Sequence, residues 1–173
     1  MDFQHTAFSK EANNYNLNLG DINGLWDVAR NKIIGLSTLS IYYRQAKDKE
    51  LKDLLEDGIN LILSKHVDKI QKALKAKGYG FPMEQNWESK LNDKSAFVIS
   101  SSIIDDEEIA MSIREIIRLT LSLEAEAIRS TTDEDIKDLL KKILDDDNQA
   151  LSAVLAIQRK KNWIDFPPAL LPQ

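Results

Sequence analysis

Residues 49–77, KELKDLLEDGINLILSKHVDKIQKALKAK, form an amphipathic run that contains one glycine and no proline. Apolar residues recur along it at helical spacing. They are Leu51, Leu55, Ile59, Ile62, Ile70 and Ala73. His66 falls on the same stripe, midway between Ile62 and Ile70, and Gly78 is a suitable residue to end the helix. This stretch predicts a long helix with a histidine near the centre of its apolar face, and the rest of the chain should supply the partners for that face.

The segment before this run predicts a helix that begins near Asp21 or Asn23, since either residue can serve as its N-cap. Its apolar stripe consists of Ile22, Leu25, Trp26, Ala29, Ile33, Leu36, Ser40 and Tyr43. No aspartate or glutamate lies on that stripe. The break at residues 46–49 is short, so the two helices should be antiparallel neighbours.

Two more helices are predicted in the second half of the chain. The first opens at Asp105 with Glu108, and the second opens at Thr131 with Glu134; both pairs match the capping-box pattern. The predicted core faces are Ile109, Ile113, Ile116, Thr120, Leu123 and Ala127 on the first helix, and Ile136, Leu140, Ile143, Asp147, Ala150, Val154 and Ile157 on the second. The break between them is again short, which favours a second antiparallel pair.

The connection from Tyr79 to about Ile104 carries no helical stripe and is long for a loop within a compact domain. A helix of about 28 residues is roughly 42 Å long, a distance that about 25 extended residues can span. We therefore predict an all-α, four-helix up-down-down-up bundle with a long crossover, the topology of ferritin-like folds. An up-down-up-down bundle with a long loop is the alternative. Residues 1–20 are predicted to be a polar N-terminal arm, and residues 21–173 a single bundle domain.

Composition excludes several functional classes. The net charge is −5, and the 23 basic residues are interleaved with 28 acidic ones, which argues against a nucleic-acid partner. The absence of cysteine excludes disulfides and thiolate chemistry. No apolar stretch approaches the roughly 20 residues that span a bilayer, and the N-terminus lacks the pattern of a signal peptide. A cytoplasmic location, with no membrane partner, is the default expectation.

The sequence offers only a partial set of metal ligands. Ferritin-like di-metal centres use carboxylates from the bundle helices and a Glu-x-x-His pattern on two of them. The two histidines of this chain are His5 and His66, and neither belongs to such a pattern. The weak metal candidates are His66, Glu124 and Asp147. Counted along the helix axes, Glu124 and Asp147 differ in height by roughly 12 Å at 1.5 Å per residue, so we expect His66 to reach one of them but not both.

A structural role is therefore the expected one for these polar residues. His66 is interpreted as a neutral core histidine that is hydrogen-bonded to a neighbouring helix. Asp147 needs a partner, because an unpaired buried charge is strongly unfavourable. His66, Arg30 or a residue of a second subunit could provide it. No catalytic residue and no cofactor is predicted.

Two irregular segments resemble a known family. Residues 75–82, KAKGYGFP, and residues 161–168, KNWIDFPP, are similar to segments of an uncharacterised, spore-coat-like family of spore-forming bacilli. Members of that family commonly close their four-helix domain with Lys-Gly-Trp followed by Pro-Pro, and Asn162 departs from the usual glycine. The resemblance implies a ferritin-like bundle and, for some relatives, association with the spore coat. It implies no catalytic residues.

Three functional hypotheses follow from these observations. The first is a non-enzymatic structural or interaction protein, cytoplasmic or spore-associated, whose partners are a second copy of itself and spore-coat proteins. The second is a metal-binding oxidoreductase with a reduced ligand set. The third is a small-molecule-binding bundle, which an interior cavity flanked by His66 and Tyr43 would favour. Leu63, Val67 and Leu74 lie off the central stripe, so they could belong either to the core or to a homodimer face.

Overall fold

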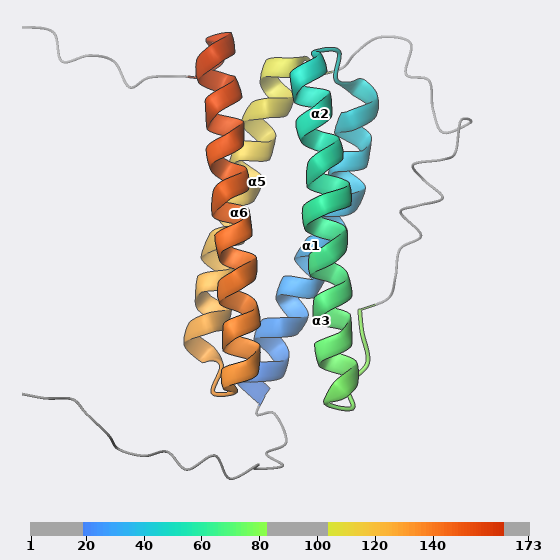
Figure 1. Ribbon diagram of the computed structural model, residues 1–173, viewed down its shortest axis with the longest axis vertical. Coiled ribbons are helices and arrows are strands. Elements are labelled where there is room, and N and C mark those ends of the chain that lie inside the picture. The colour runs from blue at the N-terminus through green and yellow to red at the C-terminus, as the bar shows by residue number, and fades with distance from the viewer. Residues whose placement is uncertain (1–18, 83–103, 165–173) are drawn as a thin grey trace, which may run out of the picture.

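The computed structural model describes residues 19–82 and 104–164 of the chain. These residues form four helical rods that pack in one bundle (Figure 1). The helical segments are α1 Leu19–Gln45, α2 Lys49–Asp57, η1 Gly58–Leu63, α3 Ser64–Ala76, α5 Asp106–Ser130 and α6 Glu134–Lys161. No strand occurs in this part of the chain. None of the helices formed by the described residues is long and apolar enough to cross a membrane.

The order of the rods confirms the predicted ferritin-like topology. The rod made of α2, η1 and α3 returns antiparallel to α1, α5 runs in the same direction as that rod, and α6 returns beside α5 (Figure 1). The end of α3 and the start of α5 therefore lie at opposite ends of the bundle, and the up-down-up-down alternative is wrong. Most of the predicted crossover, residues 83–103, lies outside the described residues, as do residues 1–18 of the predicted arm and residues 165–173.

The predicted start of α5 is confirmed in detail. Asp105 Oδ1 accepts a hydrogen bond from the Glu108 backbone N–H at 2.9 Å, and Glu108 Oε2 accepts one from the Asp105 N–H at 3.0 Å. This reciprocal pair satisfies two backbone donors that the helix leaves without partners. The predicted start of α6 is wrong by two residues, because Asp133 is its N-cap and accepts from the Ile136 N–H at 3.0 Å.

The loop between α5 and α6 is tied to α1. This helix already begins at Leu19, so Asp21 lies inside its first turn rather than at its cap. The Asp21 carboxylate accepts hydrogen bonds from the Thr131 hydroxyl and from the Thr132 N–H, each at 2.5 Å. Nearby, a Cβ on Gly24 would lie only 3.1 Å from the Cβ of Ala127, so the glycine allows α1 and α5 to approach closely.

The C-terminal ends of α3 and α6 each carry a residue in the left-handed conformation. Gly78 has φ 81° and follows α3, as the sequence predicts. Asn162 has φ 61° at the end of α6. Asparagine tolerates this conformation better than other residues with a Cβ, which explains why it can stand where the similar family usually has glycine.

Two buried apolar clusters fill the bundle, one towards each end. The first contains Leu25, Val28, Ala29, Ile70, Leu74, Ala127, Ile136, Leu140 and Ile143. The second contains Leu36, Leu39, Ala46, Leu51, Leu55, Ile59, Ile109, Ala110, Ile113 and Val154. Leu74 is fully buried, and Leu63 and Val67 pack against the second cluster, so these three residues belong to the core rather than to a homodimer face. The homodimer itself stays a prediction.

The histidine helix is interrupted by a wide turn, which the sequence analysis did not predict. Gly58–Leu63 is a π-helix, in which the Ser64 N–H donates to the carbonyl of Ile59, five residues back. The Ser64 hydroxyl donates to the same carbonyl at 2.5 Å. A π-turn absorbs one extra residue and shifts the phase of the helix that follows it. This shift is why Leu74, which lies off the predicted stripe, is fully buried while Ala73, a member of that stripe, is only partly buried.

Candidate functional site

Four polar side chains meet in a buried layer between the two apolar clusters. They are Lys32 of α1, His66 of α3, Glu124 of α5 and Asp147 of α6, so each rod supplies one. All four residues are at most 5 % exposed. We call this set the polar centre. Burying so many polar groups is unfavourable unless they satisfy one another, so their mutual contacts decide what the layer can do.

Lys32 is the hub of the polar centre. Its Nζ lies 2.6 Å from Glu124 Oε1 and donates a hydrogen bond to Asp147 Oδ2. The side chains of Lys32 and Glu124 are fully buried, and that of Asp147 is 7 % exposed. One ammonium group therefore faces two carboxylates from two different helices, and it links α1 to both of them.

His66 contacts the acidic residues of α6. Its Nε2 lies 3.0 Å from Asp146 Oδ2, and its Nδ1 lies 3.6 Å from Asp147 Oδ1, too far for a hydrogen bond. Burial lowers the pKa of His66 below its ordinary value, against the opposing effect of the hydrogen bond to Asp146. The neutral ring is therefore favoured at neutral pH, with Nε2–H as donor to Asp146. Its Nδ1 is buried without a hydrogen-bond partner.

Glu124 is the acid whose protonation is most perturbed. Burial raises its pKa to about 7, although the nearby Lys32 ammonium opposes the rise and Asp147 reinforces it. Neither carboxylate oxygen makes a hydrogen bond of good geometry, even though Oε1 lies 2.6 Å from Lys32 Nζ. The close ion-pair contact is thus the main interaction of Glu124, and the residue exchanges a proton near neutral pH.

The polar centre refines two expectations from the sequence. Glu124 and Asp147 both reach Lys32 Nζ despite their predicted difference in height, while His66 lies close to Asp147. Side chains lean towards the N-terminus of their own helix, so those of the antiparallel α5 and α6 lean towards each other, and the long Lys32 side chain bridges the remaining distance. The partner of Asp147 is Lys32, whereas Arg30 is exposed.

The sequence did contain a sign that Lys32 is buried. It lies midway between Val28 and Leu36, at four-residue spacing, and both of these residues are fully buried. A lysine is usually read as a solvent-facing residue, because lysines are almost never fully buried without a charged partner. The two acids that provide this partner are about 90 or more residues away in the chain, so helical periodicity alone could not reveal the pairing.

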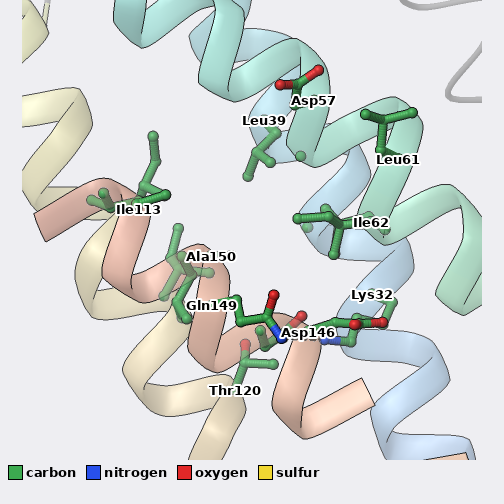
Figure 2. Close-up of a pocket in the computed structure, with 18 of the residues that line it drawn as sticks. Lys32, Leu39, Asp57, Leu61, Ile62, Ile113, Thr120, Asp146, Gln149 and Ala150 are labelled. Atoms are coloured by element: carbon green, nitrogen blue, oxygen red, sulfur yellow. Dashed lines mark hydrogen bonds and ion pairs between the residues drawn. The ribbon is translucent and has the colours of Figure 1, made fainter. Parts of the chain in front are cut away.

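A cavity of about 580 Å³ adjoins the polar centre (Figure 2). Its polar end is lined by Asn31, Lys32, Thr120, Asp146 and Asp147, and the Thr120 hydroxyl donates to Asn31 Oδ1 at 2.9 Å. The apolar lining includes Leu39, Leu54, Leu55, Ile62, Leu63, Ile113, Ile116, Ile117, Ala150, Ala153 and Val154. The wide turn of η1 forms part of one wall and α6 part of another.

Neither His66 nor Tyr43 lines this cavity, so it is a different cavity from the one that would favour the small-molecule hypothesis. Exposed residues at its edge, among them Leu61 and Lys65 on one side and Gln149 on the other, show that it opens between the histidine rod and α6. Within the described residues, no cluster of three or more His, Cys, Asp or Glu side chains is arranged to hold a metal ion.

Comparisons with solved structures identify the same fold in other proteins. A candidate spore coat protein from Bacillus halodurans C-125 superimposes with a TM-score of 0.80 at 18% identity, over 91% of this chain and 98% of that one. A conserved hypothetical protein from Mycobacterium tuberculosis gives 0.64 at 10% identity, over 80% of this chain and 96% of that one.

A third similar structure links the bundle to ferritin-like domains. It is a two-domain protein from Anabaena variabilis with DJ-1/ThiJ/PfpI-like and ferritin-like domains, and it matches with a TM-score of 0.66 at 16% identity. The match covers 88% of this chain and 40% of that protein. These likenesses establish the ferritin-like fold.

The family was identified from the sequence itself. No curated protein matches the chain. A family described as "Protein of unknown function (DUF3231)" matches residues 6–173, nearly the whole chain. This match, together with the similar Bacillus bundle, confirms the predicted resemblance to a spore-coat-like, ferritin-like family. The chain therefore belongs to the DUF3231 family.

Proposed function

We propose that the chain is a non-enzymatic structural protein of the spore, a ferritin-like bundle whose polar centre is held by the Lys32 side chain instead of a metal ion. The observation that carries this proposal is the position of Lys32 Nζ between Glu124 and Asp147. A ferritin-like di-metal protein places cations between such carboxylates. Here the cation is a side chain of α1, Lys32.

Charge explains why Lys32 disfavours a divalent cation at the same place. Two positive charges a few ångströms apart repel one another, and the repulsion is stronger in a buried site than in water. A metal ion would also need three or more ligands, and His66 is already hydrogen-bonded to Asp146. The name of the similar Bacillus protein supports the spore location.

The test is to isolate the native protein from spores of the source organism and to measure its metal content. We expect the chain in the spore coat extract, with less than stoichiometric iron, manganese and zinc. Recombinant protein that is reconstituted with each metal and then dialysed should also stay unloaded. Stoichiometric metal that is lost in a His66→Ala variant would instead show a metal site that needs His66 and would overturn this proposal. Absence of the chain from spores would refute the spore location.

Self-association remains part of this proposal. Ile34 and Ile41 lie one heptad apart on α1 and are 52 % and 56 % exposed, so they form the apolar outer face on which a second copy could pack.

The cavity supports a second candidate function, the binding of a small molecule. Its volume falls in the range of ligand sites, and its largely apolar walls, with buried polar groups beside Lys32 at one end, suit a small apolar molecule with one hydrogen-bonding head group. Unlike the first proposal, this one depends on the space beside the polar centre rather than on the ion pairs within it.

Filling the cavity tests this second candidate. Ala150 lies on the α6 wall of the cavity, so Ala150→Trp should abolish binding of a medium-chain alcohol such as octanol, measured by calorimetry. Ala156 lies on the same helix but is exposed, so Ala156→Trp is the matched control and should bind as the unmodified protein does. Absence of binding to the unmodified protein, or equal binding by both variants, would contradict a role for the cavity.

A further inference from the structure

The polar centre brings together three groups that can react with one another. The Lys32 amine is hydrogen-bonded to a carboxylate oxygen of Asp147, and a second carboxyl, that of Glu124, lies 2.6 Å from the same nitrogen. Glu124 lies beside both reacting groups, since its carboxyl and that of Asp147 contact the same Lys32 nitrogen. We propose that Lys32 Nζ and Asp147 Cγ condense to an isopeptide bond, with Glu124 as the catalytic carboxyl.

Charge and burial favour this reaction over a lasting ion pair. The contact around Lys32 Nζ holds one ammonium group and two carboxyl groups, all buried, and keeping ionised groups out of water is unfavourable. The amide product is neutral, so condensation removes two of these charges at once. Groups held in contact by a rigid framework also react as if present at about 10⁵–10⁸ M, which outweighs the excess of water that would drive hydrolysis.

Glu124 can carry the protons that the reaction moves. In the first step the Lys32 ammonium gives one proton to the Glu124 carboxylate and becomes a neutral amine. The amine nitrogen then forms a bond to Asp147 Cγ, and Glu124 returns the proton to the departing Asp147 oxygen. The nitrogen loses a second proton to the same oxygen, which leaves as water. Overall, one ammonium and one carboxylate become one amide and one water, with no redox change and with Glu124 restored.

The protonation of Glu124 suits this role. A general acid–base group works best when its pKa is near the working pH, and burial raises the pKa of Glu124 to about 7. Because Lys32 and Glu124 are fully buried, bulk water has little access to compete for the proton or to hydrolyse the product.

The bond would join α1 to α6 across 115 positions of the sequence. A cross-link that closes so long a loop restricts the unfolded chain strongly, as disulfides do. The chain contains no cysteine, so it cannot form a disulfide, and the isopeptide would provide a covalent tie that needs no oxidant.

Intact-mass spectrometry of the full chain tests the proposal. We expect a mass lower than that of the sequence by one water molecule, either at once or after a week at neutral pH. Digestion should yield a branched peptide in which Lys32 is joined to Asp147. Glu124→Gln keeps the shape of the side chain but removes the acid, so it should retain the full mass, as should Lys32→Arg.

Two outcomes would overturn the proposal. One is the full sequence mass for the unmodified protein throughout the incubation. The other is a loss of water without a branched peptide, which would place the dehydration elsewhere, for instance as a succinimide at Asp57–Gly58. If Glu124→Gln does not fold, as judged by circular dichroism, the mass and the peptide map of the unmodified chain still decide the question.

Discussion

Replacing Lys32 with methionine is expected to lower the free energy of unfolding by at least about 3–5 kcal/mol, the largest effect of any single substitution in the polar centre. Methionine has a similar length, so the packing volume is largely kept. The loss arises because Glu124 and Asp147 would remain in the core without the cation that both of them contact. Any covalent tie through Lys32 would be lost as well, which adds to the effect.

Urea denaturation at neutral pH measures this loss. Lys69→Met is the matched control, since Lys69 is an exposed lysine on α3 and its replacement should change stability by less than about 0.5 kcal/mol. The Lys32→Met variant should also recover part of its stability on acidification, because protonating the two acids relieves their repulsion. Equal stability of the two variants would show that Lys32 does not hold the polar centre together.

Stability should decrease as the pH rises from about 4.5 to 7 through the titration of Glu124. The pKa of Glu124 is raised from 4.5 to about 7 in the folded chain. Between these values the folded chain keeps a proton that the unfolded chain has lost, so raising the pH favours unfolding. The free energy of unfolding should fall by about 3 kcal/mol over this pH range, at about 1.4 kcal/mol per pKa unit. Burial is the dominant cause whether or not Lys32 and Asp147 are joined.

His66 acts in the opposite direction over part of this range. Its pKa is lowered below 6.5, so the unfolded chain binds the proton more readily and stability rises with pH through the window just below that value. The slope for Glu124 is therefore obtained from the difference between the unmodified chain and Glu124→Gln, which both retain His66. If that difference does not change with pH between about 4.5 and 7, the buried glutamate titrates normally and the assignment is wrong.

The fold could be predicted because the patterns that determine it lie within short stretches of the sequence. Apolar spacing located the four rods, and the short breaks set their antiparallel pairs. The length of the connection after Gly78 then favoured the crossover. The capping pair of Asp105 and Glu108 fixed the start of α5 closely. Thr131 was misread as a cap because its hydroxyl is used instead to hold Asp21 of a distant helix, and no local pattern contains that contact.

The candidate site was predictable only in part, because it depends on contacts between residues that are far apart in the sequence. His66, Glu124 and Asp147 were found from their positions on or beside apolar faces. Lys32 was missed, and with it the reason why the acids are tolerated in the core, since a charged residue is read as exposed until its partners are known. Counting residues along the axes did not show that Glu124 and Asp147 could meet at one cation, because side chains several ångströms long reach across more than one helical turn.

The wide turn at Gly58–Leu63 has a consequence for how relatives of this chain should be aligned. Because a π-turn absorbs one residue, a relative with one residue fewer between Ile59 and His66 could form an ordinary α-helix there and still present the histidine and Leu74 to the same neighbours. A one-residue gap at this place would thus leave the bundle and the ion pairs intact. The wall of the cavity that η1 forms would change. Relatives with and without the gap would therefore share the fold but differ in the molecules that the cavity can hold.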